Sequence, residues 1–201
     1  MRAFLAVAIG SELRDRISAV QQQLKDLVAA GPGRRVRVTW VKPETIHLTI
    51  KFLGEIDEAA VEPLRVSVGA SIDGQPAIKI PLGTVGAFPR LQAPRALWIG
   101  PPSNWDSLDE AKGALELATR IDAACEKFAV PRDAHPWRPH LTIARVREGE
   151  RDAGRVLETS ELTTRAHDIG TLHVDEISLM KSEMRPDGPV HTPLWTVGVA
   201  R

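Results

Sequence analysis

The tetrapeptide His-Leu-Thr-Ile occurs twice in this chain, at residues 47–50 and again at residues 140–143. Each copy lies in an apolar, strand-like run, and in an extended chain the side chains at i and i+2 point to the same face. Each copy therefore presents an imidazole beside a hydroxyl. Histidine is the side chain best suited to proton transfer near neutral pH, and a pair can act as base and acid in one reaction. The repeat predicts an enzyme.

The doubled motif suits chemistry at a phosphate group. If the two motif strands lie antiparallel, or face each other across a cleft, His47 and His140 flank a bound group from opposite sides. Thr49 and Thr142 then offer hydroxyl donors to the oxygens between them. One imidazole can take a proton from the nucleophile while the other gives a proton to the leaving oxygen. The residues themselves do not distinguish the acid from the base.

The sequence lacks the usual ligand patterns of a catalytic metal site. It has no His-Glu-x-x-His helix, no Cys-His cluster and no Asp-rich phosphatase motif. Cys125 is the only cysteine, so a disulfide within the chain is excluded, and we expect this thiol to pack in a helix. We therefore expect no metal and no other cofactor. The six histidines leave a metal-dependent hydrolase as an alternative.

The composition is that of an ordinary globular protein. Of the 201 residues, 26 are Lys or Arg, 26 are Asp or Glu, and 43% are hydrophobic. A protein that coats long nucleic acid usually carries a basic excess, so this role is disfavoured, while a small basic pocket stays allowed. The apolar run near the N-terminus is short and leads into a charged helix, which predicts a buried strand and not a signal sequence. No apolar segment approaches the roughly 20 residues of a membrane span, so we expect a cytoplasmic protein without membrane contact.

Hydrophobic periodicity and breaker residues predict an alternation of helices and strands. The two halves share one order, in which a long helix precedes a Pro-bearing approach, a motif strand, another helix and further strands. This order predicts two α+β lobes related by duplication. Pro63 is a weak point, because it lies inside a predicted helix. The predicted helices are 11–30, 57–70, 103–128 and 151–164, and the predicted strands are 2–9, 34–40, 46–53, 76–88, 95–100, 141–146, 171–182 and 190–199.

Five longer stretches of the sequence match the pattern of one known family. They are RAFLAVAI at the start, WVKPETIHLTIKFLGE around the first motif, RALWIG in the middle, RPHLTIAR around the second motif and ISLMKSEM near the end. Chance produces many single His-x-Thr motifs, whereas two copies with matched flanks are specific. On these stretches the chain resembles the RNA 2′,3′-cyclic phosphodiesterase (LigT-like) family of the two-histidine phosphoesterases, over nearly its whole length.

The resemblance implies an α+β fold with two pseudo-symmetric lobes of antiparallel sheet and outer helices around a central cleft. Residues 1–201 would form one such bilobal domain, with residues 47–50 in one lobe and 140–143 in the other. The implied reaction is hydrolysis of RNA or nucleoside 2′,3′-cyclic phosphate termini to 2′-phosphates. Family members are also similar in joining or cleaving 2′-5′ linked RNA ends. The implied partner is thus an RNA 3′ end or a nucleotide that bears the cyclic phosphate, and we expect a monomer.

The resemblance also implies roles for the motif residues. By motif position, His47 would be the proton donor to the departing 3′ oxygen, and His140 would be the proton acceptor that activates water. Thr49 and Thr142 would bind the nonbridging phosphate oxygens. Two rival functions stay open, a cyclic phosphodiesterase of small nucleotide metabolites and a nucleotide- or RNA-end-binding module without catalysis. The intact histidine pair disfavours the second.

Several side chains near the motifs are candidates for substrate contacts. Arg145 lies five residues after His140, which is the opposite face in a regular strand, so only a bulge or a strand end would turn it to the phosphate. Arg138 can reach the site from the Pro-rich approach to the second motif. The aromatic residues that could stack on a base are Trp40, Phe52, Trp137 and Trp195.

The remaining histidines have no partner motif, and we expect them to be surface groups or satisfied core groups. The segment GPVHTPLWTV also departs from the family, in which an aromatic residue commonly sits near His191. This departure leaves the wall that would bind a base undefined. The histidines in question are His135, His167, His173 and His191.

Overall fold

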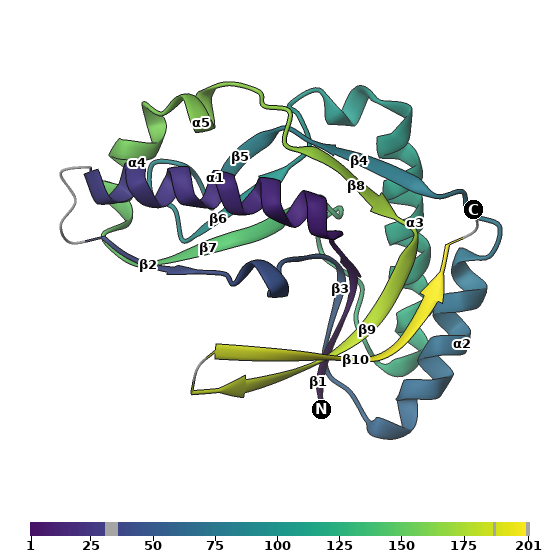
Figure 1. Ribbon diagram of the computed structural model, residues 1–201. Coiled ribbons are helices and arrows are strands. Elements are labelled where there is room, and N and C mark those ends of the chain that lie inside the picture. Colours follow the sequence, from purple (N-terminus) through teal and green to yellow (C-terminus); the bar gives the residue numbers. More distant parts are fainter. Residues whose placement is uncertain (31–35, 187, 200–201) are drawn as a thin grey trace.

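The computed structural model describes residues 1–30, 36–186 and 188–199 (Figure 1). The first two residues of the predicted strand 34–40 lie outside the described residues. The helices are α1 (Ser11–Ala30), α2 (Val61–Ile72), α3 (Asp109–Cys125), α4 (Glu150–Glu158) and α5 (Glu161–Thr164). The strands are β1 (Arg2–Ala8), β2 (Arg37–Trp40), β3 (His47–Glu55), β4 (Ile78–Leu82), β5 (Thr84–Phe88), β6 (Ala96–Gly100), β7 (Leu141–Glu148), β8 (Gly170–Val174), β9 (Glu176–Arg185) and β10 (Gly188–Gly198).

The main sheet is antiparallel and consists of two halves. Its strand order is β10-β9-β1-β3-β7-β6-β5, with β2 also paired to β7, while β4 and β8 form a separate two-stranded sheet. The two motif strands, β3 and β7, meet in the middle of this order through the pair Leu48–Leu141. The predicted α+β fold with two lobes of antiparallel sheet and outer helices is confirmed.

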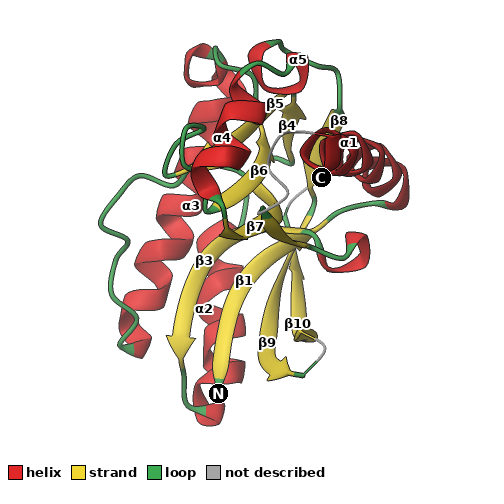
Figure 2. Cartoon of the chain, turned by 90° about the vertical axis from the view of Figure 1, so that its left-hand side faces the viewer, coloured by secondary structure: helices red, strands yellow, loops and turns green. Residues whose placement is uncertain are grey.

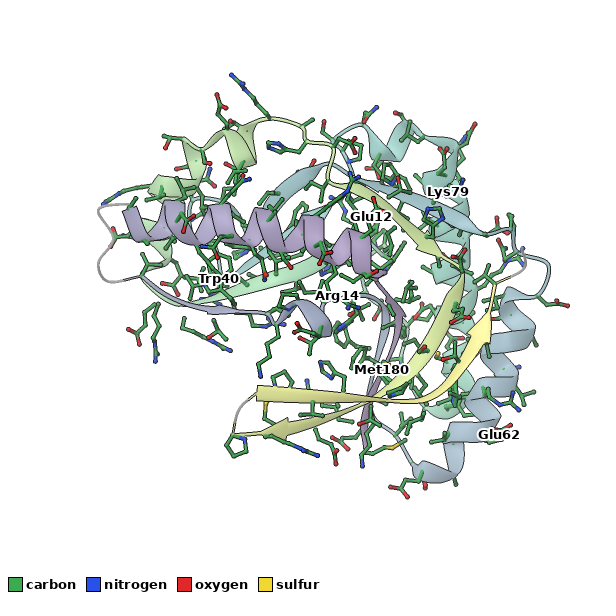
Figure 3. The ribbon with its side chains drawn as sticks, in the orientation of Figure 1. Glu12, Arg14, Trp40, Glu62, Lys79 and Met180 are labelled. Atoms are coloured by element: carbon green, nitrogen blue, oxygen red, sulfur yellow. The ribbon has the colours of Figure 1, made fainter. Side chains whose placement is uncertain are left out.

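Helices cover one face of the sheet and leave the motif face uncovered. Figure 2 shows α2 behind β3 and β1 and α3 beside β3, with no helix in front of β3, β1, β9 and β10. The α1 helix covers β2 and β7, where Trp40 lies under the helix with the Lys25 ammonium 5.6 Å from its ring (Figure 3). Leu48 and Leu141 point to the helix side and are almost fully buried. The residues that flank them in sequence therefore point to the helix-free face.

Two predicted strands each divide between the two sheets. Segment 76–88 forms β4 and β5, with Gly83 between them, where a Cβ atom would lie 2.9 Å from the carbonyl oxygen of His167. Only glycine fits this close approach of two backbones. Segment 171–182 divides at Asp175 into β8 and β9. In both cases the strand-like apolar pattern of the sequence continues across the division. It does so because each of the two strands has buried residues of its own.

The helices follow the predictions except at their ends and at residues 159–160, where the predicted helix 151–164 divides into α4 and α5. The third helix begins at Asp109, later than predicted, because a separate 3₁₀ turn (Trp105–Ser107) precedes it. Pro63 lies in the first turn of α2, where the backbone N–H has no intrahelical partner to lose, so it does not interrupt the helix. Among the helices in the described ranges, none combines the length and the apolarity that crossing a membrane requires.

Candidate active site

The two motifs meet where the halves of the sheet join. Because Leu48 pairs with Leu141 in antiparallel register, His47 lies across from Thr142 and Thr49 lies across from His140. All four side chains are half-buried and belong to the helix-free face. The structure thus brings together the four residues that the doubled motif singled out.

A backbone carbonyl fixes each motif imidazole in the same way. Nδ1 of His47 lies 2.8 Å from the carbonyl oxygen of Thr45, and Nδ1 of His140 lies 2.9 Å from that of Arg138. A carbonyl oxygen can only accept, so Nδ1 carries the hydrogen in both rings. Nε2 is then the nitrogen that can take up or release a proton in each case. The two motifs present matched acid–base groups.

The surroundings of His47 disfavour its charged form. Burial lowers the pKa of His47, the hydrogen bond to Thr45 opposes this effect, and the nearby His191 lowers the pKa further. The imidazole stacks on the Phe4 ring with centroids 4.8 Å apart. A negative charge bound next to the ring would raise its pKa again. Protonation of His47 is therefore expected to depend on a bound anion.

Aromatic residues from β5 and β6 surround the second motif. The Phe88 ring meets His140 edge-on at 5.0 Å and lies 5.4 Å from the Trp98 ring. Trp98 pairs with Thr142 across β6 and β7 and therefore shares its face. Neither Phe88 nor Trp98 is predicted from the sequence to lie at the site. The alternation in RALWIG sets Trp98 apart from Leu97 and Ile99, yet gives no sign of which face the motif occupies.

Gly86 is required for the position of Trp98, and we predict a large effect of adding one methyl group. A Cβ atom at Gly86 would lie 2.2 Å from the Trp98 ring, so Gly86→Ala must displace the indole. We expect a loss of about 1–3 kcal/mol in the free energy of unfolding, as in other overpacked sites. Urea denaturation measures it.

Gly113 provides the matched control. It lies within α3 with nothing within 4 Å of the added Cβ, so Gly113→Ala is expected to stabilise by up to about 1 kcal/mol. A Gly86→Ala variant as stable as Gly113→Ala would show that Trp98 is not held by this contact.

The first motif strand carries an extra residue, Ile50, directly after Thr49. Thr49 pairs with Ala6, and Lys51 pairs with the preceding residue, Leu5, so that β3 has two residues where β1 has one. This β-bulge reverses the alternation of side chains. Phe52, five residues after the motif histidine, consequently lies on the motif face, where it is 65% exposed.

The second motif strand has the same bulge at the matching position. Thr142 pairs with Trp98, and Ala144 pairs with Leu97. Arg145 follows on the motif face, exposed to solvent. The bulge that the prediction for Arg145 required is present. The two halves differ at this shared position, because one offers an aromatic ring and the other a guanidinium.

The Pro-rich segment before the second motif, residues 130–139, is called the approach segment, and it is hydrogen-bonded to the first motif strand. Nε1 of Trp137 donates to the carbonyl oxygen of Thr49 at 2.9 Å, so this half-buried indole ties the approach segment to β3. Arg138 is exposed, and its carbonyl orients His140. The Trp137 side chain and the Arg138 backbone therefore lie beside the site and help to fix its geometry.

The Lys51 side chain makes a second connection between β3 and the approach segment, which is not predicted from the sequence. The side chain is 2% exposed, and Nζ lies 2.5 Å from an Asp122 carboxylate oxygen and 2.9 Å from one of Asp133. Nζ also donates to the carbonyl oxygen of Pro131 at 2.8 Å. Lys51 thus joins β3, α3 and the approach segment. Regular alternation from His47 places Lys51 on the motif face, and only the bulge turns its side chain to the core, so no local sequence signal predicts this contact.

Two of the four aromatic candidates for base stacking lie in the core, which is where each of them alone is more often found, and one histidine lies closer to the site than expected. Trp40 lies under α1, and Trp195 is 9% exposed and donates to the carbonyl oxygen of Val61 at 2.9 Å, so both belong to the core side. Neither is placed to stack on a base. His191 was expected outside the site, and this is wrong, because its ring lies 5.4 Å from that of His47.

A cavity of about 800 Å³ lies next to the site, between the start of α1, the end of β1 and strands β8 and β9. Its lining includes Ala8, which pairs with His47, but none of the four motif residues. Within the described residues, no three His, Cys, Asp or Glu side chains form a group that could hold a metal ion.

Comparisons with known proteins agree with this arrangement. The model of the LigT-like phosphoesterases matches residues 7–98 and 107–191. The chain is 30% identical over 195 residues to the RNA 2′,3′-cyclic phosphodiesterase of Methanothermobacter thermautotrophicus, covering 96% of both chains. It is also 30% identical to the protein of the same name from Methanocaldococcus jannaschii, covering 95% of this chain and 96% of the relative.

Solved structures show the same fold. The protein TT0787 of Thermus thermophilus superposes with a TM-score of 0.72 at 25% identity, covering 99% of this chain and 98% of the other. E. coli LigT superposes with a TM-score of 0.69 at 23% identity, covering 100% and 98%. The two lobes and the paired histidines are those of a two-histidine phosphoesterase. Within that class, the chain belongs to the LigT-like phosphoesterase family.

Proposed function

We propose that this protein hydrolyses 2′,3′-cyclic phosphates at RNA 3′ ends, or on nucleotides, to 2′-phosphates. The observation that carries the proposal is the matched pair of imidazoles, each with Nδ1 held by a carbonyl and Nε2 available, on two strands that meet at Leu48–Leu141. Relatives that align over nearly the whole chain are named RNA 2′,3′-cyclic phosphodiesterase, which supports the same reaction here.

The proposed reaction uses the two histidines in opposite directions. Nε2 of His140 takes a proton from water as the water oxygen attacks phosphorus. The bond from phosphorus to the 3′ oxygen breaks, and protonated His47 gives its proton to that oxygen. The product carries a 2′-phosphate and a 3′-hydroxyl. Each proton transfer contributes about 10²–10⁴-fold in rate.

Neutral and cationic donors would stabilise the charge that develops on the phosphate. The hydroxyls of Thr49 and Thr142 donate to the nonbridging oxygens, and Arg145 adds a positive charge from the same face. The negative charge of the bound phosphate also favours protonated His47, whose pKa is lowered without ligand. Binding of substrate therefore supplies the protonation state that the donor needs.

The rim of the site would contact the terminal nucleotide. Phe52 is a 65% exposed aromatic ring on the motif face and suits stacking on a base. Trp137 and Arg138 border the opposite motif. We further propose that residues 1–201 act as one bilobal domain, as a cytoplasmic monomer, and that 2′-5′ joining of RNA ends can run through the same site.

A substrate panel tests the proposed function. Cyclic-phosphate-ended RNA oligomers and 2′,3′-cyclic mononucleotides are incubated with the protein in the presence of EDTA. We expect turnover of both, since the histidine pair supplies acid and base without a metal. Loss of all activity in EDTA would contradict the mechanism. Turnover of mononucleotides alone would favour an enzyme of small metabolites, and binding without turnover would indicate an RNA-end-binding module.

A further inference from the structure

We propose that His191 is a positioning residue for the first motif, which holds the ring of His47 and sets the pH range in which His47 exchanges its proton. The inference rests on the catalytic role of His47 given under the proposed function. It concerns a residue outside both motifs, on the strand farthest from β7 in its half of the sheet.

The rings of Phe4, His47 and His191 contact one another pairwise. The imidazole of His47 stacks on Phe4 with centroids 4.8 Å apart and planes 27° apart. The ring of His191 stands edge-on to both, 5.0 Å from Phe4 and 5.4 Å from His47, at angles of 84° and 86°. Phe4 thus supports one face of His47, the Thr45 carbonyl holds its Nδ1 edge, and His191 closes a further side.

The fold brings His191 to this position from the hairpin of β9 and β10. His191 pairs with Ser182, and on β9 the motif face also holds Met180, the partner of Phe4. Nδ1 of His191 is buried and has no hydrogen-bond partner among the described residues. A nitrogen without a partner can take up a proton only at a cost in desolvation. His191 is thus a titratable group that is kept neutral beside a catalytic imidazole.

The short distance couples the protonation of the two rings. Burial lowers the pKa of His191, and it is also the main cause that lowers the pKa of His47. A proton on His191 would place a like charge beside His47 and oppose its protonation. Two imidazoles this close titrate as a coupled pair, so the loss of one changes the titration of the other.

Charged and titratable side chains also lie on the elements around the pair of His47 and His191. On β9, Lys181 and Glu183 flank Ser182, belong to the opposite face and pair with each other at 3.1 Å. Glu44, in the 3₁₀ turn before β3, is exposed to solvent. Elsewhere on these elements, Arg2 begins β1, Arg14 on α1 donates to the carbonyl oxygen of Ile9 at 3.2 Å, and His140 lies across the junction from Thr49.

The test is the pH profile of kcat/KM for His191→Phe. Phenylalanine keeps a ring of similar size against Phe4 and His47, so burial is retained while the second titrating group is lost. We expect the pKa of His47 to rise. The limb of the profile that reports His47 then moves to higher pH, while the other limb stays. His173→Phe is the matched control, because His173 is an exposed residue of β8, and it should leave both limbs unchanged.

The same change is measured without turnover by an NMR titration of the His47 ring. A shift of its midpoint to higher pH in His191→Phe, and none in His173→Phe, supports the inference even if the proposed substrate is wrong. An unshifted midpoint in folded His191→Phe or His191→Gln overturns it. A pH profile in which neither limb moves would also overturn the inference.

Discussion

Replacing either motif histidine by alanine is expected to reduce kcat for a 2′,3′-cyclic nucleotide by about 10²–10⁴-fold. His47→Ala removes the proton donor to the leaving oxygen, and His140→Ala removes the base that activates water. Both rings are half-buried on the helix-free face, outside the core formed by Leu48 and Leu141, so both variants should fold. Steady-state rates with a cyclic mononucleotide measure the effect.

The two losses should not add. Because acid and base act in one concerted transfer, the double variant is expected to be little slower than the slower single variant. His173→Ala, on exposed β8, serves as the control and should retain full activity. Near-normal turnover by either motif variant, with its thermal stability intact, would rule out the two-histidine mechanism.

Lys51→Met is expected to cost about 3 kcal/mol in the free energy of unfolding, near the low end for a broken buried ion pair. Methionine fills the volume, yet it leaves the carboxylates of Asp122 and Asp133 without their cation. The low end applies because the Asp133 side chain is 51% exposed and can turn to water. Chemical denaturation measures the change. Looser anchoring of the approach segment should also lower kcat, since His140 follows that segment.

Surface pairing offers a direct control for Lys51. Lys112 and Asp109 form a fully exposed pair at 2.9 Å on α3, so Lys112→Met should change stability by less than about 1 kcal/mol. Combining Lys51→Met with Asp122→Asn should recover part of the loss, because the uncompensated charge is removed. Equal, small effects of the Lys51 and Lys112 variants would mean that the buried network contributes little.

The contribution of Lys51 should be independent of pH through the physiological range. Burial alone would lower the pKa of Lys51, but the hydrogen bonds and charges of Asp122 and Asp133 outweigh it and raise the pKa. A group whose pKa is raised by folding contributes fully below its unfolded value, near 10.4, and loses this contribution only at higher pH.

The sequence alone was sufficient to predict which motif side chains share a face and where most helices and strands lie. Period-two alternation correctly placed His47 with Thr49 and His140 with Thr142, because each His-Thr pair precedes its bulge. The bulges themselves depend on which residues the neighbouring strands offer, and no local pattern records this. For that reason the face of Arg145 stayed open and the burial of Lys51 was missed.

Long-range topology explains the other residues that sequence reasoning missed. His191 comes near His47 because the order β10-β9-β1-β3 places both residues in the same half of the sheet. Its ring contacts Phe4 on β1, which in turn stacks on His47. Trp98 lies beside Thr142 because β6 pairs with β7, which the alternation in its own strand does not reveal. The divisions at Gly83 and Asp175 likewise depend on the second sheet, which β4 and β8 form by pairing with each other.

The most direct test of the central claim is the identity of the product. RNA ending in a 2′,3′-cyclic phosphate is incubated with the wild-type protein in EDTA, and the phosphomonoester formed is identified by ³¹P NMR. The two-histidine account predicts a single 2′-phosphate signal, which does not form with His47→Ala or His140→Ala in the same time. A 3′-phosphate product, or equal conversion by these variants, would contradict it.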